Sequence, residues 1–415
     1  MDRRAGEKGD KGRGTVKRLL VINQYYAPDV ASTGQYAADI CSGLTRYGFE
    51  VHVVTGEPSY SINSPDAPGF EILNGVNVYR VPLGNVKGRE DNKTRFKGYV
   101  RFLRGAWRLA RKLLRLRKFD IILTFHNPPF VGLLGALLAK KYKIRFVYIP
   151  YDIHPDVLVA TGWRIPKLFV WVWGGVNKMV FKVAEKVVVL SEGMKNTLVH
   201  GKKVPAEKIE IIPLWGKPEL DATSSDNLIR EELKVKDSEL LLLYAGNMGI
   251  LHPLDIIIEA AKRLQGKSVK FLFIGDGAKR RYLMERVKNE NIKQVSFLPF
   301  QPVGKFIQIL ASSDACLVTI GKGLENLALP SRIFTFMSAG KPIITIMNPE
   351  ADVAKIIREN NCGWNVQTSD ELAELILDLL KDPIELKQKG KQARKTYLNQ
   401  FRRDKLIKQY AQLLK

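Results

Sequence analysis

The residues with the clearest chemical potential lie in four short segments of small and polar side chains that follow apolar runs. They span residues 31–34, 244–249, 274–277 and 323–342. A glycine-containing turn that opens a helix exposes backbone N–H groups, and such groups bind anions such as phosphate. Turns of this kind also open many helices that bind nothing. The pattern therefore leaves a phosphate site and a purely structural turn both open.

The fourth segment adds side-chain chemistry to the same pattern. Glu325 and Asn326 lie in an irregular stretch, and Pro330 marks the start of a predicted helix whose first turn holds Ser331 and Arg332. A hydroxyl and a guanidinium at that point suit a diphosphate. The alternative is a capped core helix whose arginine faces solvent.

A second chemical candidate follows a strand in the first half of the chain. The sequence Tyr-Asp-Ile-His-Pro-Asp at 151–156 places Asp152 and His154 in a loop. A carboxylate at such a point can orient an acceptor hydroxyl or accept its proton. A turn capped by Asp152, with His154 as a structural hydrogen-bonding group, is the alternative.

The elements that must position these residues repeat a simple pattern. Apolar, β-branched runs alternate with amphipathic helical stretches, first over 19–190 and again over 240–346. Buried strands alternating with helices predict α/β architecture with parallel sheets covered on both faces. Ligands of such folds bind outside the carboxyl ends of the strands. We therefore expect two Rossmann-like, doubly wound domains facing an interdomain cleft that holds the active site.

The pattern breaks between Pro213 and Glu239, where prolines, serines and mixed charges predict a linker. The predicted segments are a disordered basic leader, a first Rossmann-like domain, a linker, a second Rossmann-like domain and a C-terminal helix that could cross back to the first domain. In the same order these segments span residues 1–16, 17–215, 216–238, 239–390 and 391–415.

Composition narrows the class of protein. The chain has 415 residues, 45% of them apolar, and a formal charge of +24, which favours anionic partners. Cys41, Cys316 and Cys362 are far apart, which argues against a disulfide framework or zinc site and favours a reducing, cytosolic setting. Residues 1–18 are polar and basic and lack an apolar run, so a secretory leader is not expected. No run reaches the ~18–20 apolar residues of a membrane span, and the runs at 128–139 and 168–176 are predicted to be buried core helices.

A basic segment at 87–118 has the pattern of an amphipathic helix. Apolar residues recur at helical spacing on one side, and a second stripe is charged. Such a helix can lie on an anionic membrane, or it can pack on a sheet with its arginines in water. The predicted membrane-docking residues are Arg101, Arg104, Arg108, Arg111 and Arg115.

The order of the motifs resembles a known family. Ala-Gly-Asn-Met-Gly at 245–249, Ile-Gly-Asp-Gly at 274–277 and Leu-Pro-Ser-Arg-Ile-Phe-Thr-Phe-Met-Ser-Ala-Gly-Lys-Pro at 329–342 resemble the donor-binding half of glycosyltransferase family 4. The motifs His-Asn-Pro-Pro at 126–129 and Ser-Glu-Gly-Met-Lys at 191–195 resemble its fucosaminyl-transferase-like and colanic-acid-type branch.

This resemblance implies the GT-B fold and transfer of a sugar from a nucleotide-sugar donor with retention, without a metal or other cofactor. It also implies that the first domain binds the acceptor and the second the donor. It implies a lipid-linked or oligosaccharide acceptor, polysaccharide biosynthesis, and a cytoplasmic enzyme that is peripheral on the inner face of the membrane. Asp152 and His154 become catalytic candidates. The predicted donor-binding residues are Ser32, Thr33, Gly34, Gly246, Asn247, Gly249, Gly275, Asp276, Gly277, Glu325, Asn326, Pro330, Ser331, Arg332 and Thr335.

The sequence departs from the family pattern at four positions. Leu327 and Thr335 stand where two glutamates are usual, and Asn247 and His252 stand where an arginine and a lysine are usual. These departures keep a non-catalytic binding or assembly subunit open as an alternative, beside a nucleotide-sugar epimerase on the same fold. A nucleic-acid partner is not expected, because no recognised nucleic-acid module surrounds the basic segment.

Overall fold

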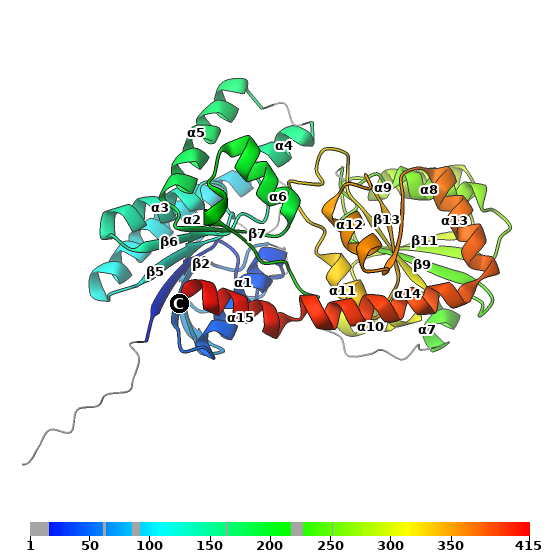
Figure 1. The fold of residues 1–415 in the computed structure, drawn as a ribbon, viewed down its shortest axis with the longest axis horizontal. Coiled ribbons are helices and arrows are strands. Elements are labelled where there is room, and N and C mark those ends of the chain that lie inside the picture. Colours follow the sequence, from blue (N-terminus) through cyan, green and yellow to red (C-terminus); the bar gives the residue numbers. More distant parts are fainter. Residues whose placement is uncertain (1–15, 61–63, 85–91, 163–164, 217–226, 251) are drawn as a thin grey trace, which may run out of the picture. The chain divides into compact units, whose positions relative to one another are not determined.

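The computed structural model describes residues 16–60, 64–84, 92–162, 165–216, 227–250 and 252–415. The predicted leader falls outside the described residues except for Val16, as does the part of the predicted linker at 217–226. The chain forms two compact units (Figure 1). Unit 1 comprises Met1–Ile149, Val176–Val187 and Ile407–Lys415, and unit 2 comprises Pro150–Gly175 and Val188–Leu406. In this division 150–175 and 188–215 group with the second unit, whereas 407–415 groups with the first.

The first sheet has eight strands in the order β3-β4-β2-β1-β5-β6-β7-β8. The pairings from β4 to β7 are parallel, and β3 pairs with β4 in the antiparallel sense. Strand β1 is a continuous apolar run whose residues 19–22 are buried, as a parallel strand covered on both faces requires. The strands are β1 (Arg18–Ile22), β2 (Glu50–Gly56), β3 (Phe70–Leu73), β4 (Val76–Val81), β5 (Ile121–Thr124), β6 (Arg145–Tyr148), β7 (Lys186–Val189) and β8 (Ile209–Ile211).

Helices cover both faces of the strands in unit 1. Helices α2 and α3 lie on one face, and α1 and α15 lie on the other (Figure 1). The packing of α2 is tight because Gly105 faces β4, where an added Cβ would collide with Val81. These helices are α1 (Ser32–Thr45), α2 (Asn92–Leu116), α3 (Val131–Tyr142) and α15 (Arg403–Leu414).

The second sheet has six parallel strands in the order β11-β10-β9-β12-β13-β14. The sequence direction of the strand order reverses between β9 and β12, which creates a switch point at the carboxyl end of β9. The strands are β9 (Leu240–Ala245), β10 (Val269–Ile274), β11 (Val295–Leu298), β12 (Ala315–Thr319), β13 (Ile343–Ile346) and β14 (Gly363–Val366).

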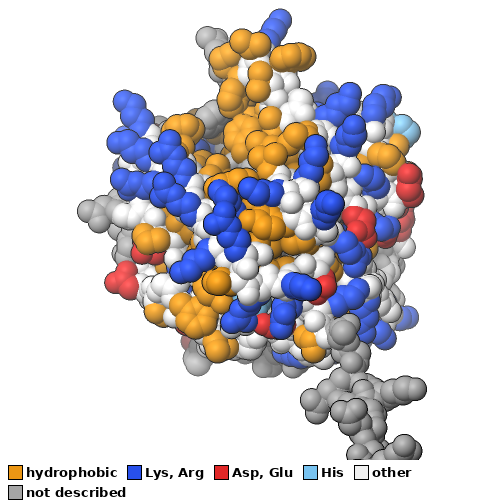
Figure 2. Space-filling model, turned by 90° about the vertical axis from the view of Figure 1, so that its left-hand side faces the viewer, with side chains coloured by type: hydrophobic (Ala, Val, Ile, Leu, Met, Phe, Trp, Pro, Cys, Tyr) orange, Lys and Arg blue, Asp and Glu red, His pale blue; other side chains and the backbone are white. Residues whose placement is uncertain are grey.

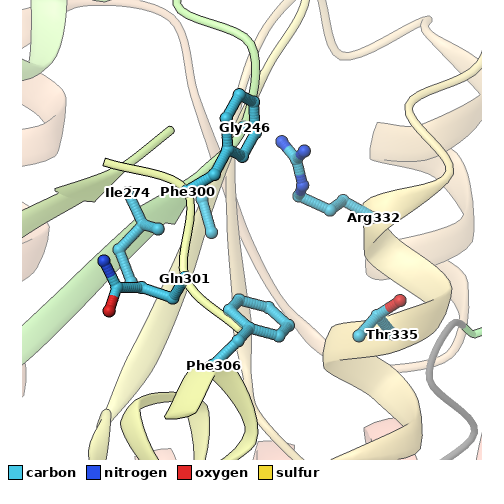
Figure 3. A pocket seen from close by; sticks show the side chains of 8 residues that line it. Gly246, Ile274, Phe300, Gln301, Phe306, Arg332 and Thr335 are labelled. Carbon is cyan, nitrogen blue, oxygen red and sulfur yellow. The ribbon is translucent and has the colours of Figure 1, made fainter. Parts of the chain in front are cut away.

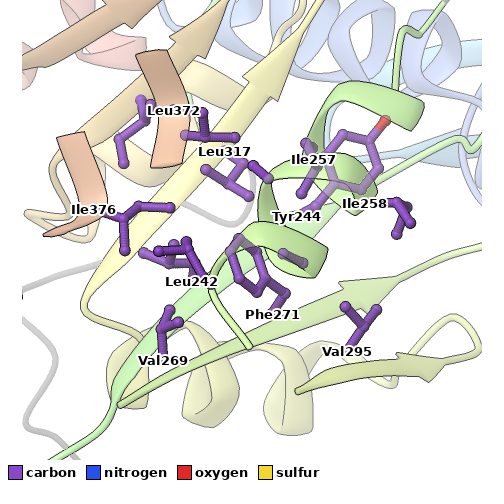
Figure 4. Close-up of a cluster of buried hydrophobic side chains, with 14 of the residues drawn as sticks. Leu242, Tyr244, Ile257, Ile258, Val269, Phe271, Val295, Leu317, Leu372 and Ile376 are labelled. Atoms are coloured by element: carbon purple, nitrogen blue, oxygen red, sulfur yellow. The ribbon is translucent and has the colours of Figure 1, made fainter. Parts of the chain in front are cut away.

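Helices α8, α9 and α13 lie on one face of this sheet, and α10, α11 and α14 lie on the other (Figure 1). Leu242, Phe271 and Leu317 from the strands pack against Ile257 of α8 and Ile376 of α13 in a buried cluster (Figure 4). The helices after β8 are α7 (Asn227–Glu232), α8 (Asp255–Arg263), α9 (Arg280–Asn289), α10 (Val303–Ser312), α11 (Arg332–Ser338), α12 (Asp352–Glu359), α13 (Ser369–Lys381) and α14 (Pro383–Thr396). This core supports the strand ends at the switch point and confirms the predicted α/β architecture.

Shorter elements and one long helix lie between β6 and β8 and before α15. They are α4 (Asp156–Ala160), α5 (Lys167–Val183), α6 (Glu192–Asn196), a π-helix at Thr197–Gly201 and a 3-10 helix at Ala206–Lys208; a second π-helix spans Tyr397–Phe401. The prediction that 128–139 forms a buried helix is confirmed for α3, in which Val131, Leu134 and Leu138 are buried.

The same prediction is wrong for 168–176. In α5 the side chains of Leu168, Phe169, Trp171 and Val172 are exposed, and Trp171 keeps 75% of its surface. Trp173 is buried on the opposite side, where its ring stacks on that of His154 at 6.0 Å. Apolar side chains occur on all sides of this helix, but only one side packs against the protein.

Candidate active site

A cavity opens at the carboxyl ends of β9 and β10, at the switch point of the second sheet. Its volume is about 190 Å³. Arg332 and Thr335 face it from α11, Phe300 and Gln301 from the segment that joins β11 to α10, and Phe306 from the first turn of α10 (Figure 3). Ala245, Gly246 and Ile274 complete the lining. The cavity therefore joins one guanidinium, one hydroxyl and two aromatic rings.

Gly246 and Arg332 are in direct contact although they lie far apart in the sequence. A Cβ added to Gly246 would collide with Nη1 of Arg332 and would lie 2.6 Å from its Cζ. Only glycine, which has no Cβ, leaves room for the guanidinium in this position. The glycine that the sequence marks as a loop residue thus places the cation of the cavity.

The loops after β9 and β10 are joined by backbone hydrogen bonds. The amide of Gly246 donates to the carbonyl of Ile274 at 2.7 Å, and that of Met248 donates to the carbonyl of Asp276 at 2.8 Å. Both amides are therefore used inside the protein. These two amides are not available to an anion, and the donor role predicted for the loop stays a prediction.

Two further glycines permit this close approach of the loops. Gly275 and Gly277 have φ angles of 136° and 149°, which L side chains rarely adopt. A Cβ on Gly275 would collide with the carbonyl oxygen of Gly246, and one on Gly277 would lie 2.6 Å from the carbonyl carbon of Met248. The Gly-Asp-Gly segment thus fixes the position of Gly246, and Asp276 accepts from the Gly277 amide at 2.8 Å.

His252 and Asn247 take part in the structure of this region without adding a cation. The Nδ1 atom of His252 lies 2.9 Å from the carbonyl oxygen of Thr319. Because a carbonyl only accepts, Nδ1 carries the proton. Burial lowers the pKa of His252, and the nearby cations Arg332 and Lys279 lower it further. The imidazole is therefore neutral near pH 7. The backbone carbonyl of Asn247 accepts from the Tyr244 hydroxyl at 2.9 Å.

The charge of Arg332 also affects the pKa of a neighbouring tyrosine. Burial raises the pKa of Tyr244 to about 12, and the positive charge of Arg332 acts in the opposite direction. Among the residues that the structure describes around the cavity, Arg332 carries the one formal charge. An anion entering the cavity therefore meets a single guanidinium within a largely apolar wall, where charge-assisted hydrogen bonds are strong.

The front of the fourth segment lies apart from the cavity lining. The backbone carbonyl of Asn326 accepts from the Thr197 hydroxyl at 3.2 Å, and its side chain lies against Gly193. Neither Glu325 nor Asn326 lines the cavity with Arg332. Pro330 and Ser331 come directly before α11 and are half-buried. Thr335, by contrast, is buried and faces the cavity (Figure 3).

The structure brings the Asp152 segment to this same loop. Asp152 forms an isolated antiparallel bridge with Ala328, and the amide of Ile153 donates to the carbonyl of Leu327 at 3.1 Å. Asp152 and His154 are both half-buried. A carboxylate and an imidazole thus lie beside the strand-like stretch that leads into α11 and Arg332.

Ser32, Thr33 and Gly34 begin α1 in unit 1. Gly34 packs against the backbone of Tyr25, where an added Cβ would lie 2.9 Å from the carbonyl carbon. The hydroxyl of Thr33 accepts from the side-chain amide of Asn127 at 3.2 Å. These three residues do not line the cavity of unit 2, and their predicted role with the donor stays a prediction.

Comparison with known proteins agrees with this geometry. The family described as "Glycosyl transferase 4-like domain" matches residues 33–215, and that described as "Glycosyl transferases group 1" matches residues 225–396. Together the two matches span most of the chain. The chain is a GT-B glycosyltransferase.

Individual relatives of this glycosyltransferase have low sequence identity, but the alignments cover most of both chains. It is 22% identical to the probable glycosyltransferase WbjE of Pseudomonas aeruginosa, over 86% of its own length and 87% of the relative. It is also 22% identical to the putative colanic acid biosynthesis glycosyl transferase WcaI of Escherichia coli K12, over 78% and 81%. The structure of Anabaena HepE in complex with UDP and glucose superposes with a TM-score of 0.67 at 15% identity, covering 96% and 99% of the two chains.

Three cavity residues of the glycosyltransferase are missed by the sequence interpretation. Phe300, Gln301 and Phe306 lie after β11, a strand whose carboxyl end meets the same sheet edge as β9 and β10. The Phe-Gln-Pro sequence at 300–302 contains no glycine pattern that would mark a ligand loop. The available signal is positional, because the loop after each parallel strand of this sheet lies at the same edge as the loops after β9 and β10.

The predicted basic stripe of the glycosyltransferase lies on α2. Arg101, Arg104, Arg108 and Arg115 are exposed, and Arg101 also donates to the carbonyl of Leu83 at 2.7 Å; Arg111 is half-buried and lies over the ring of Trp107 at 5.8 Å. None of the described helices combines the length and apolar character that crossing a bilayer requires.

Proposed function

We propose that this glycosyltransferase transfers a sugar from a nucleotide-sugar donor to a lipid-linked glycan, with retention at the anomeric carbon, in the assembly of a cell-surface polysaccharide. The observation that carries the proposal is the contact of the Arg332 guanidinium with Gly246 in the cavity after β9. A guanidinium beside aromatic rings suits a nucleoside diphosphate, because it pairs with phosphate oxygens while the rings contact the base.

The donor diphosphate binds at Arg332 in this proposal. Phe300 keeps 66% of its surface exposed at the cavity rim, where its ring is available for stacking on a nucleobase. The Thr335 hydroxyl provides a hydrogen bond to a donor hydroxyl group. The relation to HepE, whose structure contains UDP and glucose, supports a nucleotide-sugar donor.

The reaction breaks the bond between the anomeric carbon and the diphosphate oxygen, and the electron pair leaves with the diphosphate. Arg332 stabilises the charge that develops there. An acceptor hydroxyl oxygen forms the new bond to the anomeric carbon on the same face from which the diphosphate departs, so that the configuration is retained, and it releases its proton to the Asp152 carboxylate, which His154 helps to position. The sugar passes through an oxocarbenium-like state. These steps use side chains of the protein, and we propose no metal or other cofactor.

The acceptor and the location are proposed from two features. WcaI is named for the biosynthesis of colanic acid, which supports a glycan acceptor. Exposed arginines on α2 and exposed apolar side chains on α5 suit the surface of an anionic membrane. We therefore propose a cytoplasmic enzyme that works as a peripheral protein on the inner face of the membrane, without a nucleic-acid partner.

A donor screen tests the proposed function. Binding of UDP-, GDP- and ADP-sugars is measured first, and the sugars that bind are then incubated with membrane extracts to detect transfer to a lipid fraction. We expect one donor class to bind and to release its nucleoside diphosphate only with extract present. Conversion of the donor sugar without extract would identify an epimerase instead. Donor binding without any turnover would identify a non-catalytic subunit.

A further inference from the structure

A second concave surface lies in unit 1, between α2 and α3. Its volume is about 460 Å³, which is within the ~300–1,000 Å³ of typical ligand sites. Its lining combines apolar side chains with two arginines. The α2–α3 groove is lined by Leu103, Arg104, Trp107 and Arg108 of α2, and by Phe130, Leu133, Leu134 and Leu137 at the start and along the face of α3.

The apolar part of the groove remains in contact with water. Leu137 keeps 42% of its surface exposed, and Leu103, Trp107 and Leu133 are half-buried. Contiguous apolar surface of this kind is unfavourable in water and marks a binding surface. Phe130 has a left-handed backbone with φ of 69°, which is uncommon for a bulky residue. This conformation places its ring against the groove directly before α3.

Positive charge borders the same groove. Arg104 and Arg108 are exposed and lie one helical turn apart on α2, a helix without a single Asp or Glu. The guanidinium of Arg111 lies over the Trp107 ring, which adds a third cation near the groove. Figure 2 shows hydrophobic side chains between Lys and Arg side chains on this side of the molecule. The occupant must therefore combine a hydrocarbon part with a negative charge.

We propose that the α2–α3 groove binds one anionic phospholipid of the membrane surface, with part of an acyl chain against Trp107, Leu133 and Leu137 and the phosphate at Arg104 and Arg108. The groove thus holds a single lipid, whereas the rest of the basic stripe acts only through its charge. This inference rests on the proposed action at a membrane and adds the lipid class and the site that recognises it.

A matched pair of double variants separates the specific role of the groove arginines from the general effect of positive charge on α2. Arg104→Gln with Arg108→Gln removes the groove arginines, whereas Lys112→Gln with Arg115→Gln removes the same charge from the exposed end of α2. Binding to vesicles of phosphatidylcholine with phosphatidylglycerol is measured by co-sedimentation, without donor or acceptor. Two lost surface charges weaken binding by roughly 30-fold. The proposal expects the groove pair to weaken binding at least about fivefold more than the matched pair.

Trp107 reports on the acyl chain directly. Its fluorescence is followed as vesicles containing phosphatidylglycerol brominated along the acyl chain are added. The measurements use a Trp171→Phe background, because the exposed Trp171 of α5 is itself proposed to face the membrane. In this background we expect quenching, also with Leu116→Ser, a control at an exposed leucine outside the groove. Adding Trp107→Phe is expected to remove most of the quenching, and adding Leu137→Ser is expected to weaken it. Circular dichroism confirms that each variant is folded.

Equal weakening by the two double variants, or quenching that persists when Trp107→Phe is added to the Trp171→Phe background, would refute the lipid site in the groove and support a non-specific basic surface. Quenching with brominated phosphatidylcholine that equals the quenching with phosphatidylglycerol would overturn the role of the arginines. None of these results affects donor binding, which is measured on the same variants in solution. Failure of the groove is thereby distinguished from failure of the proposed transferase function.

Discussion

Replacing Gly246 by alanine places one methyl group where the Arg332 guanidinium lies. The added Cβ would be 2.6 Å from Cζ of Arg332, well inside the ~3.5–4.0 Å of an ordinary carbon contact. The guanidinium must therefore retreat by about 1 Å or more. Gly246 is not among the described glycines with positive φ, so alanine fits the backbone. Because the atoms that must move are the flexible end of an arginine, we expect the fold to survive.

The expected consequence is weaker binding of the donor diphosphate. A hydrogen bond to a charged group contributes about 1.5–3 kcal/mol, so its loss raises the Kd of the nucleoside diphosphate by roughly 10- to 150-fold. Isothermal titration calorimetry with UDP, GDP and ADP measures this change for the base that binds. Gly304→Ala is the matched control, since a Cβ on Gly304 meets open space.

A double-mutant cycle identifies Arg332 as the cause. In an Arg332→Ala background, Gly246→Ala has no guanidinium to displace, and we expect it to change the Kd by less than about threefold. An equal effect of Gly246→Ala with and without Arg332 would refute the reasoning. So would a Gly246→Ala protein that binds the nucleotide as tightly as the wild type.

Three further predictions concern the same region. Thr335→Val keeps the shape of the side chain but removes its hydroxyl, so it is expected to weaken donor binding by about 2- to 13-fold in calorimetry, and unchanged binding would exclude the hydroxyl from donor contact. Asp152→Asn should lower the rate of transfer by about 100-fold or more while the donor Kd stays within about twofold, because only the side chain changes and the backbone bridge to Ala328 remains; full activity would remove Asp152 from the mechanism. The pKa of His252 is lowered by burial, so protons favour the unfolded chain, and the stability present above the ordinary histidine pKa of about 6.5 is lost as the pH falls towards the folded-state pKa. Thermal unfolding between about pH 7.5 and pH 5 should therefore show a steeper loss of stability for the wild type than for His252→Asn, and parallel curves would contradict the buried, neutral imidazole.

The sheets of this protein are predicted well from the sequence because their strands are continuous apolar runs. Leu19 to Ile22 and the run from Leu240 to Ala245 are buried on both sides, so their composition alone requires helices on both faces. The predicted glycine loops after β9 and β10 follow from the same logic, since a parallel strand must end in a loop at the ligand edge.

Other features depend on contacts that no local pattern encodes. The collision that fixes glycine at position 246 involves Arg332, which another part of the chain supplies. The Gly246 and Met248 amides donate hydrogen bonds to another loop, so they are not free to bind an anion as the sequence alone suggests. Phe300 and Gln301 reach the cavity only because β11 lies at the edge next to β10.

The apolar run in α5 illustrates a different limit. Its composition resembles that of the buried helix α3, yet Leu168 and Trp171 are exposed. Hydrophobicity reports how favourable burial would be, but the neighbouring elements decide which side of a helix is covered. Asp152 is similar, because its pairing with Ala328 joins segments whose sequences give no sign of a bridge.

A crystal structure with the tightest-binding nucleoside diphosphate tests the central claim most directly. The account predicts diphosphate oxygens within hydrogen-bond distance of the Arg332 guanidinium, beside Gly246, with the base near Phe300. A nucleotide bound elsewhere, with Arg332 making no contact to its phosphates, would contradict it.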